Sequence, residues 1–172
     1  MTAGSDAILT ERARKLAIAP QVTSDSMTEE MLRFALGEER FLAPLRSVRE
    51  VASLDSITSI PGLPFRFAGL TTFRGDIVPV VDVRGLLGLP EHRPEHAENI
   101  LIIESDGAPT AIWVDRMQGL VAVDTTLLTQ DHAMTNAGFR GRTPDLCTVV
   151  DLAALVGVAR ATESQNPHPE ET

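Results

Sequence analysis

The stretch AGLTTFRGDIVPVVDVRGLLGL at residues 68–89 constrains the fold of this chain more than any other segment. Its first six residues can form a strand, the letters RGD at 74–76 supply a tight turn, and IVPVV forms an apolar second strand. Asp82 stands between that strand and VRGLLG, where its carboxylate can accept N–H bonds from a first helical turn. Gly88 is expected to end that turn. The stretch therefore predicts a hairpin closed by a capped short helix, and it contains no catalytic pattern.

A second stretch repeats this plan near the other end of the chain. The letters FRG at 73–75 recur 66 residues later, and VVDVRGLLG at 80–88 recurs 69 residues later as VVDLAALVG. This reading of the repeat predicts a three-residue insertion at the second turn. Asp151 takes the place of Asp82, so both aspartates are predicted to be structural caps. The repeat predicts two small β modules of similar plan.

The remaining ordered segments are predominantly strand-like. MLRFAL, RFLAP, NILIIE, APTAIWVD and RMQGLVAV are apolar or alternating runs, and GEER and SDG read as hairpin turns. Residues 44–51 are the exception, because Leu45, Val48 and Val51 have helical spacing and predict a short helix. Many short strands with Gly and Pro turns favour small β-barrels over a parallel α/β sheet.

The chain divides into three predicted regions. Residues 1–30 are expected to hold an amphipathic helix over 6–19 and a polar linker, and the helix could pack on its own domain, fray or act as a docking segment. Residues 31–156 form the folded domain. Residues 157–172 are polar and acidic and are expected to be disordered.

Charge and composition exclude several classes of function. A net charge of −9 argues against nucleic-acid binding and against an anionic membrane surface. The single cysteine, Cys147, excludes an internal disulfide and a Cys-rich zinc site, and its apolar surroundings predict burial. His92 and His96 are separated by Pro94, which favours a solvated linker over a metal site. No cofactor, metal or membrane insertion is expected, and the protein is predicted to be cytoplasmic.

One family accounts for these motifs together. The stretch GLTTFRGDIVPVVDVR at 69–84, with FALGEERFLAPLRSVREV before it and VDRMQGL at 114–120, resembles the CheW-like domain of bacterial chemosensory arrays over residues 31–156. The resemblance implies a mainly β fold of two intertwined five-stranded β-barrels. It also implies a non-enzymatic adaptor that joins chemoreceptors to a CheA-type histidine kinase in chemotaxis signal transduction.

The resemblance further implies where partners bind. The groove between the barrels would hold the receptor's cytoplasmic helical hairpin, and Arg74, Val48, Glu50 and Val51 match residues at that groove. The exposed end of one barrel would pair with the kinase's regulatory domain, with weak self-association, in arrays at the inner face of the membrane. Thr72-Phe73 replaces the family's Asn-Leu, and residues 130–145 depart most from the family pattern, so contacts there are expected to differ.

Two other functional interpretations remain open at this point. An enzyme or ligand-binding barrel would use Asp82, Asp115 and Asp124 as polar groups of a cleft between the modules. Alternatively, an adaptor of the same family would serve a chemosensory pathway that controls pili or second-messenger output. The residues alone make Arg74 an ordinary solvated arginine beside a turn, and only the resemblance assigns it a partner.

Overall fold

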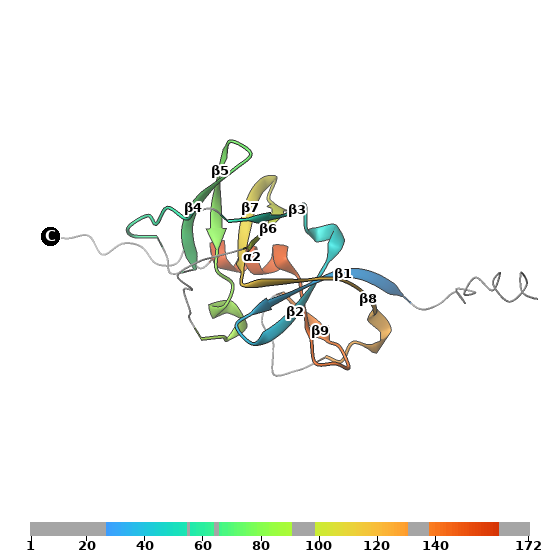
Figure 1. Cartoon of the computed structure of the whole chain (residues 1–172). Helices are drawn as coiled ribbons and strands as arrows, with labels where there is room; N and C mark the ends of the chain where they lie inside the picture. The colour runs from blue at the N-terminus through green and yellow to red at the C-terminus, as the bar shows by residue number, and fades with distance from the viewer. Residues whose placement is uncertain (1–26, 55, 64–65, 91–98, 131–137, 162–172) are drawn as a thin grey trace, which may run out of the picture.

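The computed structural model describes residues 27–54, 56–63, 66–90, 99–130 and 138–161 (Figure 1). Ten strands lie in these residues: β1 (Thr28–Leu36), β2 (Glu39–Pro44), β3 (Glu50–Ser53), β4 (Phe67–Phe73), β5 (Asp76–Val81), β6 (Asn99–Ser105), β7 (Ala108–Val114), β8 (Arg116–Asp124), β9 (Phe139–Arg142) and β10 (Thr148–Val150). Three 3₁₀ turns, η1 (Leu45–Ser47), η2 (Gly85–Leu87) and η3 (Thr125–Leu127), and helix α2 (Leu152–Ala161) complete the order.

The strands form two five-stranded sheets with the same internal plan. Sheet A has the order β8-β1-β2-β10-β9, and sheet B has the order β3-β6-β7-β5-β4. Each strand of one sheet has its counterpart in the other sheet five strands away along the chain. Sheet B is built from the consecutive strands β3 to β7, whereas sheet A combines β1 and β2 with β8, β9 and β10. This arrangement confirms the predicted mainly β fold.

Each sheet curls towards a barrel because one bridge links its two edges. In sheet A, Thr129, which follows β8, pairs with Arg142 of β9. In sheet B, Thr58, which follows β3, pairs with Leu70 of β4. We call the two closed sheets the A barrel and the B barrel.

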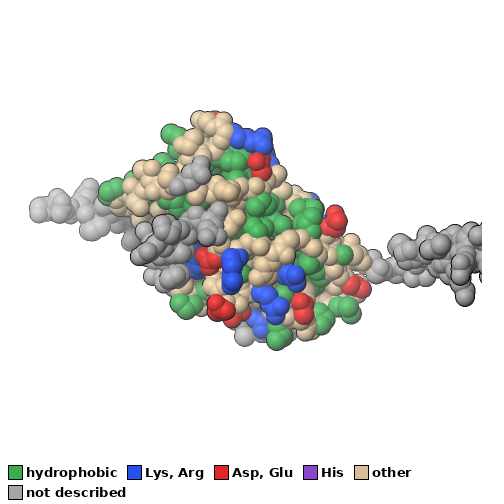
Figure 2. Space-filling model, in the orientation of Figure 1, with side chains coloured by type: hydrophobic (Ala, Val, Ile, Leu, Met, Phe, Trp, Pro, Cys, Tyr) green, Lys and Arg blue, Asp and Glu red, His purple; other side chains and the backbone are tan. Residues whose placement is uncertain are grey.

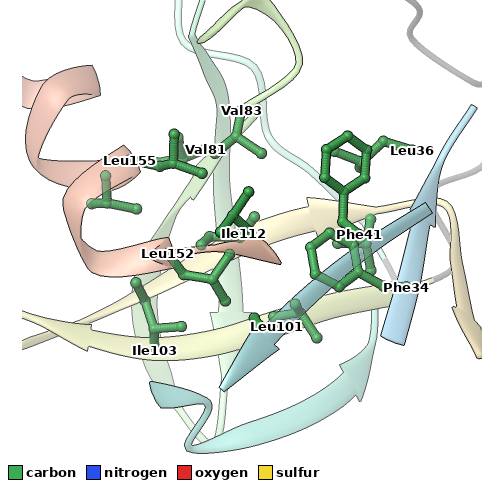
Figure 3. Packing of buried hydrophobic residues seen from close by; sticks show 14 of the residues in the cluster. Phe34, Leu36, Phe41, Val81, Val83, Leu101, Ile103, Ile112, Leu152 and Leu155 are labelled. Atoms are coloured by element: carbon green, nitrogen blue, oxygen red, sulfur yellow. The ribbon is translucent and has the colours of Figure 1, made fainter. Parts of the chain in front are cut away.

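The largest core cluster lies between the two sheets. Phe34 and Phe41 stack there with their ring centroids 5.8 Å apart, and Ile112 of sheet B is fully buried beside them (Figure 3). Helix α2 adds Leu152 and Leu155, both at most 1% exposed. Burial of this many large apolar side chains from both sheets joins the two barrels into one folded unit.

Each barrel also has its own interior. The B barrel encloses apolar side chains that include Val78, Ile102 and Trp113. The A barrel encloses a smaller cluster built on Met31, Leu42, Cys147 and Val149. The predicted burial of Cys147 is therefore correct, since its side chain has no exposed surface.

The structure corrects the alignment of the internal repeat. Gly69 pairs with Val80 and Gly141 pairs with Val149, so the counterpart of Phe139-Arg140-Gly141 is residues 67–69 and not 73–75. From Leu70 to Val80 the chain advances ten residues, whereas from Arg142 to Val149 it advances seven. The second hairpin therefore lacks three residues, and the predicted insertion is wrong. The tripeptides at 73–75 and 139–141 have the same sequence but occupy different positions in their hairpins, so their identity does not reflect structural equivalence.

Two predicted elements also differ from the structure. The expected helix over 44–51 is only the 3₁₀ turn η1, because Arg49 N–H donates to the Ile102 carbonyl at 2.8 Å and Glu50 begins strand β3. The tail expected from 157 onwards is helical to Ala161, because buried Ala159 extends the apolar face of α2. The predicted helix at 6–19, the histidines 92 and 96, and residues 162–172 lie outside the described residues.

Candidate partner-binding surface

An ion pair joins the tip of the β4–β5 hairpin to the first residue of β3. Arg74 Nη2 lies 2.6 Å from Glu50 Oε2, and the arginine side chain is 69% exposed. Arg74 and Gly75 form a two-residue turn with φ values of 53° and 92°, which is the backbone that tight hairpins require. The Arg74 Cζ atom lies 5.4 Å from the centroid of the Phe73 ring. The structure thus brings together two of the four residues predicted to contact a partner.

The two predicted valines lie on either side of Glu50 along the chain. Val51 follows Glu50 on β3 and is 41% exposed. Val48 is partly buried and packs against the cluster between the sheets. On the neighbouring hairpin Ile77 is 73% exposed. Sheet B therefore presents apolar side chains close in sequence to a solvent-exposed charge pair.

This arrangement can accept a carboxylate from another molecule. An exposed ion pair contributes only about 0–1 kcal/mol to stability. Arg74 can therefore exchange Glu50 for an acidic side chain of a partner at little cost. Its planar guanidinium is suited to hold a carboxylate through two N–H donors.

Asp82 and Asp151 make different contacts although they occupy equivalent positions. Asp151 Oδ1 accepts the Ala154 N–H at 3.1 Å in the first turn of α2. Asp82 Oδ1 accepts the Arg84 N–H at the start of η2 and, in addition, the Arg84 guanidinium, each at 3.0 Å. Asp82 thus accepts one N–H at the start of a helical turn, as predicted, and also forms an ion pair, because the residue two positions later is an arginine here and an alanine in the second copy.

The three aspartates proposed for a catalytic or ligand-binding cleft do not share one site. Asp82 and Asp115 both bind Arg84, whose side chain is 3% exposed. Asp124 bonds within its own turn, where the hydroxyl and N–H of Thr126 hold the pKa of its carboxyl below the usual value. In the part of the chain that the structure describes, no group of three His, Cys, Asp or Glu side chains is placed to hold a metal. Sequence reasoning missed Arg84, whose only signal was its place at the end of the 69–84 motif.

The open end of the A barrel is a second surface feature. A cavity of about 110 Å³ there is lined by Arg33, Leu42, residues 121–123, Asp145 and Cys147. The hydroxyl of Thr143 donates to Asp145 at 2.6 Å and holds the pKa of that carboxyl below its usual value. Burial raises the pKa of the Cys147 thiol, which keeps it neutral.

Leu146 lies in the chain between two residues that line this cavity, Asp145 and Cys147, and has an unfavourable backbone conformation. Its φ is 64°, a conformation that favours glycine, and its side chain is 68% exposed. Backbone strain of this kind clusters at functional sites, which makes Leu146 a candidate contact residue.

The charged groups on the surface are mixed in sign. In the face that Figure 2 shows, basic and acidic side chains lie among one another with apolar side chains between them. None of the helices in the described residues is both long enough and apolar enough to cross a membrane.

Comparisons with known proteins agree with this fold. The CheW-like domain family matches residues 30–160. The chain is 30% identical over 88 residues to a chemotaxis protein CheW of Klebsiella aerogenes, covering 51% of this chain and 52% of the relative. It is 25% identical over 111 residues to the protein PilI of Pseudomonas aeruginosa, covering 64% of this chain and 62% of the relative. The matches thus span about half to two thirds of these relatives.

A solved structure extends the similarity to three dimensions. The crystal structure of scaffolding protein TtCheW from Thermoanaerobacter tengcongensis superposes with a TM-score of 0.65 and 27% sequence identity. The superposition covers 75% of this chain and 92% of that one. The family match over most of the chain and the shared fold identify this chain as a member of the CheW-like domain family.

Proposed function

We propose that this protein is a cytoplasmic, non-enzymatic scaffold that couples chemoreceptors to a CheA-type histidine kinase. The observation that carries the proposal is the exposed Glu50–Arg74 pair beside Val51, on a chain of this family. A co-sedimentation assay with receptor-containing membranes and kinase tests it. The protein is expected to sediment with the receptors and to change kinase activity. If it stays in the supernatant and kinase activity is unchanged, the proposal fails.

The receptor contact combines an apolar surface with one cation. A helical hairpin presents small and apolar side chains that can lie against Val48 and Val51, as helices do in apolar grooves. A glutamate on the hairpin would then replace Glu50 as the partner of Arg74. The contact is weak for a single molecule and gains strength when many copies bind one array.

We expect Arg74→Glu to weaken association with receptor membranes by about tenfold, because it places like charge opposite the hairpin's carboxylates. The fold should survive, since the Glu50–Arg74 pair is exposed and contributes little. Arg116→Glu is the matched control, because it makes the same charge change at another exposed arginine. Equal sedimentation of the two folded variants would contradict the placement of Arg74 at the contact.

The kinase contact is proposed at the open end of the A barrel. Leu146 is an exposed apolar side chain, and the nearby cavity has apolar side chains in its wall, including Leu42 and Val121. The end of a similar barrel on the kinase's regulatory domain can pack against such a surface. A small contact of this kind suits an assembly held by avidity, including weak self-association within the array.

Replacing Leu146 with glycine separates binding from stability. Glycine adopts a φ of 64° without strain, so the free energy of unfolding should stay level or rise by up to about 1 kcal/mol. Affinity for the kinase's regulatory domain should fall by about tenfold, because an apolar anchor is lost. Leu127→Ala, at a leucine that is 57% exposed on η3, is the control. Retained affinity in Leu146→Gly would remove this surface from the proposal.

The similarity to protein PilI favours a second candidate. In this version the same adaptor serves a chemosensory pathway with pilus or second-messenger output. Mixing the protein with the histidine kinases of its own cell and measuring which one binds separates the two candidates. Binding to a kinase of the flagellar pathway alone would remove the second candidate.

A further inference from the structure

Arg84 is a buried cation held by three different groups. Its guanidinium donates to Asp82 Oδ1 at 3.0 Å and to Asp115 Oδ1. Its Cζ atom lies 5.2 Å from the centroid of the Trp113 ring. The residue is 2% exposed, so these contacts are largely removed from solvent. Asp82, Arg84 and Trp113 all belong to the half of the fold built around sheet B.

Asp115 extends this cluster to the other barrel. It lies between β7 and β8, where the chain leaves sheet B and enters sheet A. Its Oδ2 accepts the Gly37 N–H at 2.5 Å, in the turn between β1 and β2 of sheet A. Its own N–H donates to the Ala35 carbonyl at 3.1 Å. A continuous series of polar contacts therefore runs from Asp82 through Arg84 and Asp115 to sheet A.

The A barrel shows that a barrel of this plan does not require the cluster. Asp151 is the counterpart of Asp82, so Ala153 is the counterpart of Arg84. The A barrel is completed with an alanine at that position. Burying a cation and two carboxylates is also not an efficient way to gain stability, because desolvation offsets most of their attraction. Stability alone therefore does not account for Arg84.

We propose that Arg84 is a positioning residue that fixes the orientation of the A barrel relative to the B barrel. The proposed receptor groove lies between the barrels, since Val48 packs against the cluster that both sheets share. A rotation of one barrel would change the width of that groove. A guanidinium that bonds to Asp82 and Asp115 at once resists such a rotation, because its planar fork has a fixed geometry. This role rests on the proposed function.

The test begins with a measurement that needs no partner. Spin labels at Glu39→Cys in sheet A and Asp76→Cys in sheet B, in a Cys147→Val background, report the distance between the barrels by pulsed electron paramagnetic resonance. Both labelled positions are exposed, and valine is the residue that stands at the Cys147 counterpart, residue 78. Arg84→Met should broaden or shift the distance distribution. The fluorescence emission of Trp113, the single tryptophan, should change as well, because the substitution removes the guanidinium that lies against its ring.

Binding measurements then connect orientation to function. In Arg84→Met, affinity for the receptor hairpin should fall by about tenfold, whereas affinity for the kinase's regulatory domain, which is proposed to contact one barrel end, should change by less than about threefold. Arg84→Lys keeps the charge without the fork, and it should give an intermediate distance distribution. It is also the variant to use if Arg84→Met does not fold.

The outcomes separate the inference from the function on which it rests. An unchanged distance distribution in a folded Arg84→Met or Arg84→Lys variant overturns the positioning role, whatever the partners are. Equal losses of affinity for both partners, with an unchanged distribution, would indicate a general structural role and would also overturn it. If the wild-type protein binds neither partner, the proposed function fails, while the distance measurement still decides whether Arg84 orients the barrels.

Discussion

Gly69→Ala is expected to lower the free energy of unfolding by about 4 kcal/mol or more, which is a large share of the stability of an ordinary domain. Gly69 has a φ of 145°, which a residue with a side chain rarely adopts. A Cβ atom at this position would lie 2.3 Å from the carbonyl oxygen of Thr58. That carbonyl accepts the Leu70 N–H at 2.9 Å, and the Leu70 carbonyl accepts the Thr58 N–H at 2.8 Å. The added methyl group would therefore break the bridge that closes the B barrel.

The counterpart in the A barrel provides a matched control. Gly141 has a φ of 141°, but a Cβ atom there would lie 3.2 Å from the Thr129 carbonyl oxygen and 3.1 Å from Leu128 Cβ. Small shifts can relieve these contacts, so Gly141→Ala should cost about 1–3 kcal/mol. Urea unfolding followed by circular dichroism measures both variants. If Gly141→Ala proved as destabilising as Gly69→Ala, the close approach at Thr58 would not be the cause.

These two glycines also show what local sequence patterns predict about the fold and what they do not. The repeated VVD and the apolar runs correctly indicated two related β modules, because strand formation follows from local alternation and β-branched residues. The equivalence of Gly69 and Gly141 escaped notice because it depends on pairing with Val80 and Val149. The assembly of sheet A from β1 and β2 at one end of the chain and β8 to β10 at the other likewise depends on long-range pairing.

The candidate site was predictable to a similar extent. Arg74 and Glu50 were both named from the sequence, but their ion pair joins a turn to a strand 24 residues earlier, and only the fold brings them together. Asp82 was assigned as a cap from its neighbours along the chain. Its partner Arg84 is also bound to Asp115, 31 residues away, and no local pattern indicates that contact. Local reasoning thus found the residues and missed the partners that decide their roles.

The two barrels differ in charge at one interior position. In sheet A, Arg33 pairs with Leu42, and Leu42 pairs with Val149. In sheet B, Ile102 pairs with Ala111, and Ala111 pairs with Val80. Because Val149 and Val80 are equivalent, Arg33 is the counterpart of Ile102. Ile102 has no exposed surface. Arg33 is only partly buried and lines the cavity at the open end of the A barrel, where its Nε atom has no hydrogen-bond partner among the described residues.

The lengths of the two hairpins explain why an arginine is tolerated in one barrel only. The β4–β5 hairpin is three residues longer than the β9–β10 hairpin, and Phe73 near its tip packs against the interior of the B barrel. We attribute the cavity of the A barrel to the shorter hairpin. Arg33 lines this cavity and is only partly buried, so its side chain keeps contact with solvent. An arginine at position 102 would have no such contact and would leave a charge buried among apolar side chains.

Ile102→Arg is therefore expected to lower the free energy of unfolding by about 4–5 kcal/mol, because burial of an unpaired charge is among the few changes with effects of this size. The reciprocal change, Arg33→Ile, should leave stability level or raise it by up to about 1 kcal/mol, because it replaces a partly buried cation with an apolar side chain that the barrel interior favours. Urea unfolding of the two variants, followed by the emission of Trp113 inside the B barrel and by circular dichroism for the whole fold, measures both effects. Losses of similar size in the two variants would contradict this account, because they would mean that both barrels are closed to the same degree and that hairpin length does not control access to their interiors.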